Sequence, residues 1–443
     1  MKIGVVSLGC SKNLVDTEIM LGFLADSGHE IEPDPNRAEI IIVNTCGFIE
    51  SAKMESIETI LEMGAFKAKG SCSGLIVTGC LSQRYPDQLW REIPEIDGLL
   101  GTNELDLIND IVRQVAQGRR VRRSAAGLFG YDQVYKRIST TGRHLAYLKI
   151  GEGCSHNCAF CAIPQIRGPF RSRSLPIIVE EGKRLIKKGA REIALIAQDT
   201  TAYGRELGIN LVQLLRNLAE LNVPWLRLLY TYPSGLTREL LEFISREPKF
   251  VKYVDLPLQH VSGSVLRRMK RPGDYRSIVE QIQKIRKIIP GAAIRSSFIV
   301  GFPGETEKDF LMLKHFLREM RLTHVGIFKY SREGGTSAYK LQPQLEKDCI
   351  EERFQELMEL QRGISLELNR SFVGEEIDVL IEAVSAESDL VLVGRHQGQA
   401  PDVDGVVYLN RGDFNIGDIV PVKITRAYPY DLVGEVLEKD EFT

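Results

Sequence analysis

The stretch GEGCSHNCAFC, residues 151–161, decides how this chain is interpreted. It places Cys154, Cys158 and Cys161 at the spacing C-x3-C-x2-C. A closed structural metal site uses four protein ligands, so three thiols leave one coordination position open. The stretch continues from LAYLKI, an apolar run typical of a buried strand, so the thiols stand where a strand passes into a loop.

One interpretation of these three cysteines is half of a zinc site, with His156 or a distant cysteine as the fourth ligand. Zinc motifs usually contain two cysteine pairs, and this chain has no second C-x2-C. Cys349 lies far away in an expected helix. The spacing therefore favours three thiolates that hold three irons of a cubane from one loop.

Length and composition describe an ordinary globular chain. Its 443 residues are 43% hydrophobic and 26% charged, with a formal net charge of −2, which suggests about three domains and no strong attraction to nucleic acid. No apolar run approaches the roughly 18 residues of a membrane helix, and the start MKIGVVSLGC indicates a strand, not a signal peptide. We expect a cytoplasmic protein whose eight cysteines serve metal or redox chemistry before disulfides.

The first part of the chain, residues 1–118, alternates expected strands and helices and predicts a doubly wound α/β domain. The expected strands are KIGVVSLG, EIIIVNTC, GLIVTGC and DGLLGT. The basic segment GRRVRRS that follows is interpreted as a solvated linker.

Residues 140–372 continue the alternation over six units, which predicts an incomplete (β/α)6 barrel whose active face is the carboxyl end of its strands. Its expected strands are LAYLKIGEG, EIALIAQD, WLRLLYTYP, KYVDLPLQH, AAIRSSFIVGFPGE and HVGIFKYS. A helix, EERFQELMELQRGISLELNRSF, leads out of it. Residues 373–443 hold short strands between Gly, Asp and Pro, which predicts a small antiparallel β-barrel. The whole chain is thus expected to be of the α/β class.

A second set of cysteines is dispersed: Cys10, Cys46 and Cys80 each end an expected parallel strand of the first domain. Carboxyl ends of parallel strands lie along one edge of a sheet, where ligands bind. A single cysteine at such a place is usually an inert buried residue, but three favour a second three-thiolate cluster. Cys72 precedes its strand and, like Cys349, has no such position.

The motif C-x3-C-x2-C with Phe160 before the last cysteine resembles the radical S-adenosylmethionine (SAM) superfamily. The resemblance implies that SAM fills the open position, and that reduction of the cluster cleaves SAM to methionine and a 5′-deoxyadenosyl radical. Together with the second set, the chain resembles the methylthiotransferases. In that family an auxiliary [4Fe–4S] cluster carries the sulfur, a radical SAM barrel binds the second cluster, and a small TRAM barrel follows. The resemblance therefore implies two [4Fe–4S] clusters, SAM as both methyl donor and radical source, and a low-potential electron donor.

Branches of that family differ in substrate. SLGCSKNLVDTE, EIALIAQDTTAYG and GQAPDVDGVVYLN resemble the branch that modifies the β-carbon of an aspartate in small-subunit ribosomal protein S-twelve. Branches that modify a tRNA adenosine usually carry Gln-Met or Lys-Val where this chain has Ser11 and Lys12.

The charge of the last block gives a separate indication of substrate. Residues 373–443 hold fifteen Asp and Glu against five Lys and Arg, a formal charge of 5 − 15 = −10. RNA binding requires a basic face, so this block is expected to repel RNA and attract a basic ribosomal protein. An acidic surface that only aids solubility is the alternative. Asp402 and Asp404, in the turn APDVDG, are expected to be exposed there.

Further polar residues follow strands at the same face. The resemblance makes Phe160 and Gln198 candidates for contact with SAM. Gly301 and Glu305, in VGFPGET at the end of the fifth strand, are further candidates because glycine allows close approach of adenine, and a plain tight turn is the alternative. Gln259 and His260 are expected to face the same site. RSRS at 171–174 is interpreted as a solvated basic run, with contact to the substrate or to the SAM carboxylate as the alternative. The alternatives to an S-twelve methylthiotransferase are a tRNA adenosine methylthiotransferase and a non-catalytic iron–sulfur carrier. Clusters that only transfer electrons are commonly closed by four cysteines, which argues against the carrier.

Overall fold

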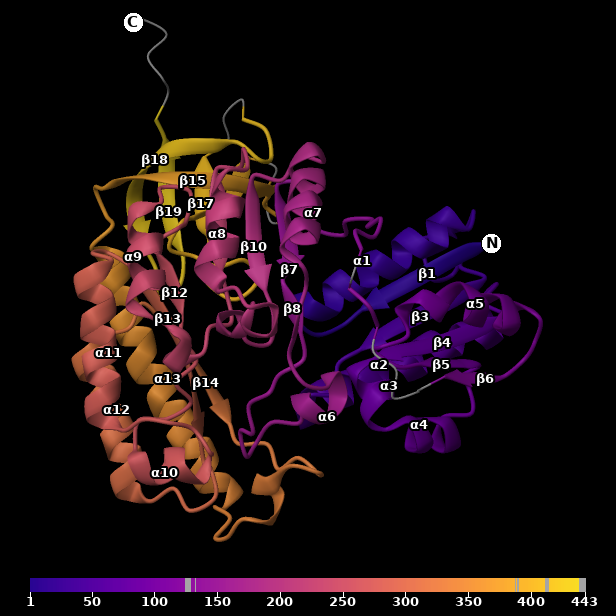
Figure 1. The fold of residues 1–443 in the computed structure, drawn as a ribbon, viewed down its shortest axis with the longest axis horizontal. Helices are drawn as coiled ribbons and strands as arrows, with labels where there is room; N and C mark the ends of the chain where they lie inside the picture. Colours follow the sequence, from indigo (N-terminus) through magenta and orange to yellow (C-terminus); the bar gives the residue numbers. More distant parts are fainter. Residues whose placement is uncertain (124–128, 132, 387, 389, 411–413, 438–443) are drawn as a thin grey trace, which may run out of the picture.

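The computed structural model describes residues 1–123, 129–131, 133–386, 388, 390–410 and 414–437. Figure 1 shows three packed units: an N-terminal α/β unit, a barrel of strands covered by helices, and a small β-barrel at one end of it. The predicted fold class is confirmed. No helix of the described residues is both long and apolar enough to cross a bilayer.

The N-terminal unit is a parallel sheet of six strands in the order β2-β1-β3-β4-β5-β6. The strands are β1 (Lys2–Ser7), β2 (Glu30–Ile31), β3 (Ile40–Thr45), β4 (Gly74–Gly79), β5 (Gly98–Leu100) and β6 (Val121–Arg123). The helices are α1 (Ser11–Asp26), α2 (Glu50–Lys69), α3 (Cys80–Arg84), α4 (Pro86–Glu92) and α5 (Ile108–Ala116).

Both faces of this sheet are covered, which is why its central strands are apolar at every position. In β3, Ile40 and Ile42 pack with α1 and α5, whereas Ile41 and Val43 pack with α2 and α4. The interpretation of GRRVRRS as a linker is wrong: its middle residues form β6, an edge strand whose arginines leave its open side charged.

The central barrel has the six parallel strands that the sequence predicts, in two runs of three joined between β11 and β12. They are β7 (Leu145–Lys149), β10 (Glu192–Ile196), β11 (Trp225–Leu228), β12 (Tyr253–Asp255), β13 (Ala293–Val300) and β14 (His324–Lys329). The outer helices are α7 (Leu175–Lys187), α8 (Leu211–Ala219), α9 (Arg238–Arg246), α11 (Tyr275–Ile288), α12 (Glu307–Met320) and α13 (Lys347–Arg370). Shorter elements are β8 (Gly151–Glu152), β9 (Arg171–Ser172), α6 (Ile163–Arg167) and α10 (Gly263–Arg268).

The C-terminal barrel is closed by five strands in the order β15-β16-β17-β19-β18. They are β15 (Glu376–Val384), β16 (Val391–His396), β17 (Val407–Asn410), β18 (Ile419–Ala427) and β19 (Leu432–Val436). Its ladders are antiparallel as predicted, except that β17 and β19 pair in parallel.

The two ends of one barrel strand show how the units are placed. Glu192, the first residue of β10, pairs with Arg395 of the C-terminal barrel at 2.7 Å. Asp199, just after the end of the same strand, pairs with His156 of the cysteine loop at 2.7 Å. The C-terminal barrel thus covers the amino ends of the strands, and the cysteine loop lies at the carboxyl ends, which we call the mouth.

Candidate active site

The three cysteines of the central barrel lie on the loop between β8 and α6 at the mouth. We call Cys154, Cys158 and Cys161 the barrel triplet. The Cys154 N–H bonds to the Gly168 carbonyl at 3.0 Å, and the Cys161 N–H bonds to the Cys158 carbonyl at 3.1 Å, so the loop is compact. The Arg271 guanidinium lies 3.5 Å from the Cys158 sulfur. One short segment therefore presents all three thiols.

The other three thiols come from three separate loops. Cys10 follows β1, Cys46 follows β3 and Cys80 follows β4; we call them the edge triplet. The strand order changes direction between β1 and β3, and ligands of such sheets bind outside the strand ends at that point.

Two glycines bring these loops together. A Cβ on Gly9 would lie 2.9 Å from the Cys46 Cβ, and one on Gly47 would lie 2.7 Å from the Leu81 Cα. Since a side chain at either position would collide, the loops approach as closely as glycine alone permits.

The two triplets meet across α6. Cys80 packs against Ala162, the residue directly after Cys161, and against Ile166. At the end of the same helix, Arg167 is 2% exposed and donates a hydrogen bond to the Cys80 sulfur at 3.3 Å. The thiols predicted at two unrelated places in the sequence therefore share one region of the molecule.

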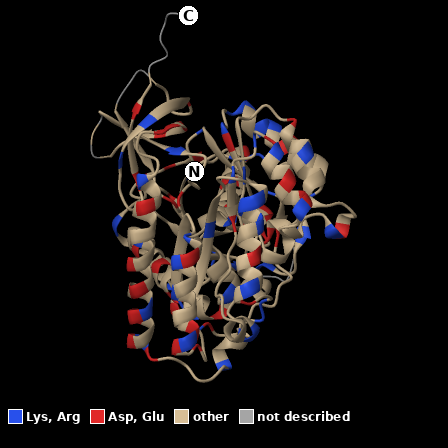
Figure 2. Cartoon of the chain, turned by 90° about the vertical axis from the view of Figure 1, so that its left-hand side faces the viewer, with Lys and Arg blue, Asp and Glu red and all other residues tan. Residues whose placement is uncertain are grey.

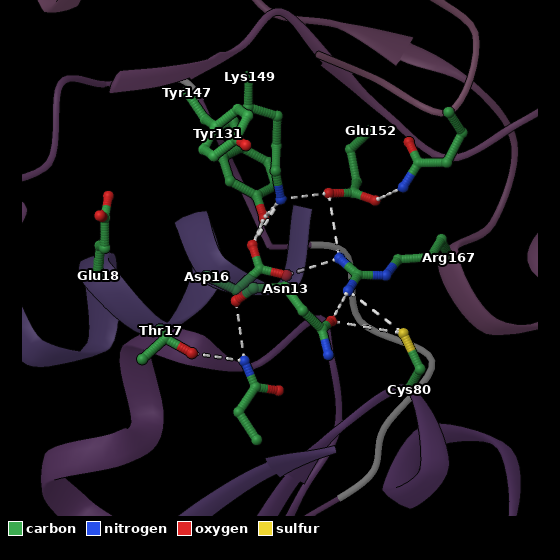
Figure 3. A network of polar contacts seen from close by, with 12 residues as sticks. Asn13, Asp16, Thr17, Glu18, Cys80, Tyr131, Tyr147, Lys149, Glu152 and Arg167 are labelled. Atoms are coloured by element: carbon green, nitrogen blue, oxygen red, sulfur yellow. Dashed lines mark hydrogen bonds and ion pairs between the residues drawn. The ribbon is translucent and has the colours of Figure 1, made fainter. Parts of the chain in front are cut away.

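Arg167 belongs to a buried polar network that joins the two units (Figure 3). Its guanidinium contacts Asp16 of α1 at 2.7 Å and Asn13 at 2.5 Å. Lys149, at the end of β7, contacts the same Asp16 at 2.5 Å and Glu152 at 2.7 Å. Each buried charge thus has an opposite partner, which is the condition for burying an ion without a large penalty.

The surroundings of the thiols differ in charge. Burial raises the pKa of Cys154 to about 11 and that of Cys161 to about 12. Burial also raises the pKa of Cys46 to about 11. Cys10 is exposed, and although the protein around it displaces water and acts to raise its pKa, the Lys12 ammonium, two backbone N–H groups and the Arg167 guanidinium outweigh this and lower its pKa.

The donor set suits iron–sulfur clusters better than single metal ions. All eight cysteines are free. Within the described residues, no three His, Cys, Asp or Glu side chains converge as ligands of one ion would. A cubane does not need such convergence, because each thiolate binds a different iron.

Two of the candidate SAM contacts lie beside the barrel triplet. Phe160 is half-buried and meets the Phe302 ring edge-on at 6.5 Å. Gln198 follows β10 and donates to Glu152 at 2.6 Å, while its Oε1 is buried and has no hydrogen-bond partner among the described residues. That free acceptor leaves Gln198 able to bind a donor group of a ligand.

The other two candidates are occupied within the chain. Glu305 is 4% exposed; one oxygen accepts the Gly301 N–H at 2.9 Å and the other accepts from Arg353 at 2.5 Å. Gly301 has a φ of 76° and faces Ile350 of α13. Gly301 and Glu305 therefore form a turn that is held by contacts within the chain. Their contact with SAM stays a prediction.

Three other expectations for the mouth need correction. His260 is fully buried, its Nδ1 accepts the Ser262 N–H, and burial lowers its pKa to about 4, so it does not face the mouth. The strand before it ends at Asp255, earlier than expected, and the backbone of Gln259 forms an isolated bridge with Phe298, so the direction of the Gln259 side chain stays a prediction. Arg173 of RSRS is 4% exposed and bonds to Glu181, so the segment is not simply solvated.

The structure also corrects part of the expectation for the turn APDVDG, in which Asp402 and Asp404 were both expected to be exposed. Asp402 accepts a hydrogen bond from Tyr147 at 2.6 Å, and Asp404 accepts one from Tyr253 at 2.6 Å. The Asp404 side chain is 2% exposed and lies 3.4 Å from Arg295. Asp402 and the neighbouring Val403 are exposed, as expected for Asp402. Asp404 is not, because its side chain packs against the base of the central barrel.

Several site residues are not apparent from sequence patterns. His156 stacks on Tyr232 with ring centres 3.6 Å apart while pairing with Asp199. Of these residues, Lys149 could have been recognised from the sequence. A lysine inside the apolar run LAYLKI is expected to be buried and therefore to need a buried partner of opposite charge. Arg167 and Asp16 gave none.

Comparison with known proteins agrees with these features. Three family models match: "Uncharacterized protein family UPF0004" over residues 2–101, "Radical SAM superfamily" over 148–317, and "TRAM domain" over 373–437. Among solved structures, a radical S-adenosylmethionine methyltransferase, TsrM, from Kitasatospora setae with cobalamin and a [4Fe-4S] cluster bound is similar in fold. Its TM-score is 0.56 at 16% identity, covering 84% of this chain and 78% of that one.

Curated relatives match nearly end to end. "Ribosomal protein uS12 methylthiotransferase RimO" of Geobacter sulfurreducens is 46% identical over 440 residues, 98% of each chain. The protein of the same name from Desulforudis audaxviator is 48% identical over 440 residues, covering 98% of this chain and 97% of its own. The chain therefore belongs to the family of ribosomal protein uS12 methylthiotransferases.

Proposed function

We propose that this chain transfers a methylthio group to the β-carbon of an aspartate in ribosomal protein uS12, the S-twelve of the sequence comparison. The observation that supports this most directly is the meeting of two free-thiol triplets across α6 at one barrel mouth. Full-length relatives at 44–48% identity bear that activity in their names. A carrier that only moves electrons needs neither a barrel mouth nor two open coordination positions.

The chain's own residues would act mainly by holding and positioning. In this proposal Cys10, Cys46 and Cys80, within 1–118, hold an auxiliary [4Fe–4S] cluster. Cys154, Cys158 and Cys161, within 140–372, hold the second cluster, and residues 373–443 form the TRAM barrel. When bound, the clusters and SAM supply the sulfur, the methyl group and the oxidising power to break an unactivated C–H bond.

The buried network would fix how far apart the two clusters stand. Arg167 lies at the end of the helix that begins after Cys161, and it contacts Cys80 and Asp16 of the other unit. Glu152 of β8 contacts both that guanidinium and the ammonium of Lys149, at the end of the first barrel strand. Positioning within fractions of an ångström matters for group transfer between two centres, and paired charges in a water-free interior supply such rigidity.

We propose further that acidic groups of the C-terminal barrel attract the basic substrate from a distance. Glu375, Glu376, Asp378 and Glu435 are exposed there, whereas charges of both signs are interspersed on the helices of the central barrel (Figure 2). This barrel covers the end opposite the mouth, so the attraction would act on association and not on the reacting groups. A cytoplasmic location and a low-potential electron donor follow from this function.

The test is methylthiolation of purified uS12 by the reconstituted protein with SAM and a reductant, read by mass spectrometry of uS12 peptides. We expect the mass of one methylthio group on one aspartate. A variant with Cys10, Cys46 and Cys80 changed to Ala is the control and should give none. Modified tRNA with unmodified uS12 would overturn the substrate assignment, and SAM cleavage with neither product would overturn the transferase itself.

A further inference from the structure

Two buried cations at the mouth form no ion pair within 4.0 Å among the described residues, although the Asp255 carboxylate acts on one of them, Lys12, from further away. Nine Lys and Arg residues are buried as whole residues in the described part of the chain. Seven of the nine lie within 4.0 Å of a carboxylate oxygen: Arg137, Lys149, Arg167, Arg173, Arg227, Arg353 and Arg395. The two that do not are Lys12 and Arg271, each 8% exposed. Burying a cation without a counter-charge is costly, so such positions call for a ligand.

The two cations occupy corresponding places. Lys12 lies over the Tyr230 ring, 3.1 Å from its centre, and Arg271 lies over the Tyr232 ring at 4.6 Å. Arg271 already donates to the Pro257 carbonyl and to the Cys158 sulfur. Lys12, by contrast, contacts Tyr230 and has no other hydrogen-bond acceptor in the described part of the chain. Its ammonium therefore still has N–H groups that could donate to a ligand.

The chain around Lys12 is arranged for an anion. Cys10, two residues earlier, is solvent-exposed, so the space beside the lysine opens toward the edge triplet. Helix α1 begins there with no side-chain cap and no acidic residue in its first turn. A helix start favours negative charge, so a carboxylate at this place would meet both the ammonium and the helix end.

The platform under Lys12 is held rigidly. Tyr230 has a φ of 58°, which is uncommon for a residue other than glycine. Its N–H donates to Asp255 Oδ2 at 2.8 Å, and its hydroxyl lies 3.2 Å from Ser11 Oγ. Lys12 therefore lies between Cys10 of the edge triplet and the mouth of the central barrel.

We propose that Lys12 binds the side-chain carboxylate of the substrate's aspartate and thereby selects an acidic side chain for the reaction. This rests on the proposed function and adds the group that recognises the substrate. The β-carbon of an aspartate is bonded to its carboxylate carbon. A carboxylate held by Lys12 therefore keeps the reacting carbon beside the edge triplet, between the two cluster positions.

The test is a cycle of two enzymes and two substrates. Lys12→Met removes the charge at nearly constant size, and a uS12 variant with the target Asp changed to Asn removes the carboxylate charge. We expect Lys12→Met to weaken binding of native uS12 by the holoprotein roughly 10- to 100-fold, the usual worth of a charge-assisted hydrogen bond. It should cause no further loss with the Asn substrate, and Lys12→Arg should retain most of the affinity.

The matched control is Lys67→Met, which removes a lysine paired with Asp97 in the same unit and should leave both affinities unchanged. Equal discrimination between the two substrates by wild type and Lys12→Met would overturn the proposal. Iron content is measured alongside; if Lys12→Met loses iron, the cycle is run with Lys12→Gln. Iron loss in both variants would assign Lys12 to the edge cluster and also overturn the proposal. A wild type that modifies no uS12 would instead refute the proposed function.

Discussion

The two thiol triplets meet at the same mouth but are built in different ways. The barrel triplet comes from one loop of eight residues, Cys154 to Cys161. The edge triplet comes from three loops up to 70 residues apart, since 80 − 10 = 70, and exists only when β1, β3 and β4 are paired. A cluster held by one loop needs that loop alone, whereas a cluster held by a sheet edge needs the folded domain.

The triplets differ in charge as well. Lys12 and Arg167 lie beside the edge triplet, and Arg167 touches Cys80 directly. Beside the barrel triplet, Arg271 contacts Cys158 from a greater distance. The edge site therefore has more positive charge beside its thiols, which suits its proposed role of holding a sulfur anion in addition to its own thiolates.

Removing either triplet should give the largest effect and separates the two roles. With Cys154, Cys158 and Cys161 changed to Ala, iron content should fall from about eight to about four per chain, and SAM cleavage should stop. With Cys10, Cys46 and Cys80 changed to Ala, iron should fall equally, but SAM cleavage should continue without methylthio transfer. Iron analysis and product assays check this; eight irons retained in either variant would refute that triplet.

Arg167→Met should break the link between the triplets. Asp16 and Glu152 would each lose a buried counter-charge, so we expect the free energy of unfolding to fall by about 3–5 kcal/mol. Denaturant unfolding measures this. The control is Arg91→Met, because Arg91 is 72% exposed and its pair with Glu92 should be worth less than about 1 kcal/mol. Equal losses in both variants would show that the network does not join the units.

Thiol reactivity in the iron-free protein should sharpen the electrostatic difference. At pH 8 we expect Cys10 to be alkylated first, since its pKa lies below the ordinary value. The pKa of Cys154 rises from 9.0 to about 11, which leaves about a hundredfold less thiolate at that pH. Its alkylation rate should climb about tenfold per pH unit until pH 11. Peptide mass spectrometry after timed alkylation measures both, and similar rates for the two cysteines at pH 8 would contradict the prediction.

The smallest expected effect concerns the C-terminal barrel, away from both triplets. Changing the exposed pair Glu376 and Asp378 to Gln and Asn should slow uS12 association by no more than about fivefold at low salt. The effect should vanish as salt screens the charges. The control neutralises Glu58 and Glu62, exposed on α2 of the first unit. A slower rate that persists at high salt would mean a direct contact and not attraction at a distance.

Much of this arrangement follows from local sequence. The strand-ending cysteines were recognisable because apolar strands are read within a few residues, and parallel strands align their ends. Strand β12 is shorter than expected because Pro257 cannot continue the ladder. Strand β6 was missed because its charged residues resemble a linker, although edge strands tolerate charge.

Contacts between distant segments were not recognisable. Arg167 meets Asp16 across 151 positions, and no periodicity relates the two. Asp404 sits in a turn that composition places at the surface, but the surface it faces is another part of the same chain. In the sequence, Lys12 was noted only as part of the motif SLGCSKN. Its burial without an ion pair depends on the folded molecule and could not be predicted from the sequence.

The closed base of the central barrel limits how such proteins can be recombined. Glu192 of the central barrel pairs with both Arg227 and Arg395, so Arg395 joins the two barrels, and Arg395 also pairs with Glu382 inside the C-terminal barrel. A chimera that takes its C-terminal barrel from a protein lacking an arginine at 395 would leave Glu192 with Arg227 as its remaining ion-pair partner among these residues. Breaking a buried pair in this way costs about 3–5 kcal/mol. The C-terminal barrel and the strand starts beneath it are therefore expected to change together in evolution, and a functional graft has to carry both.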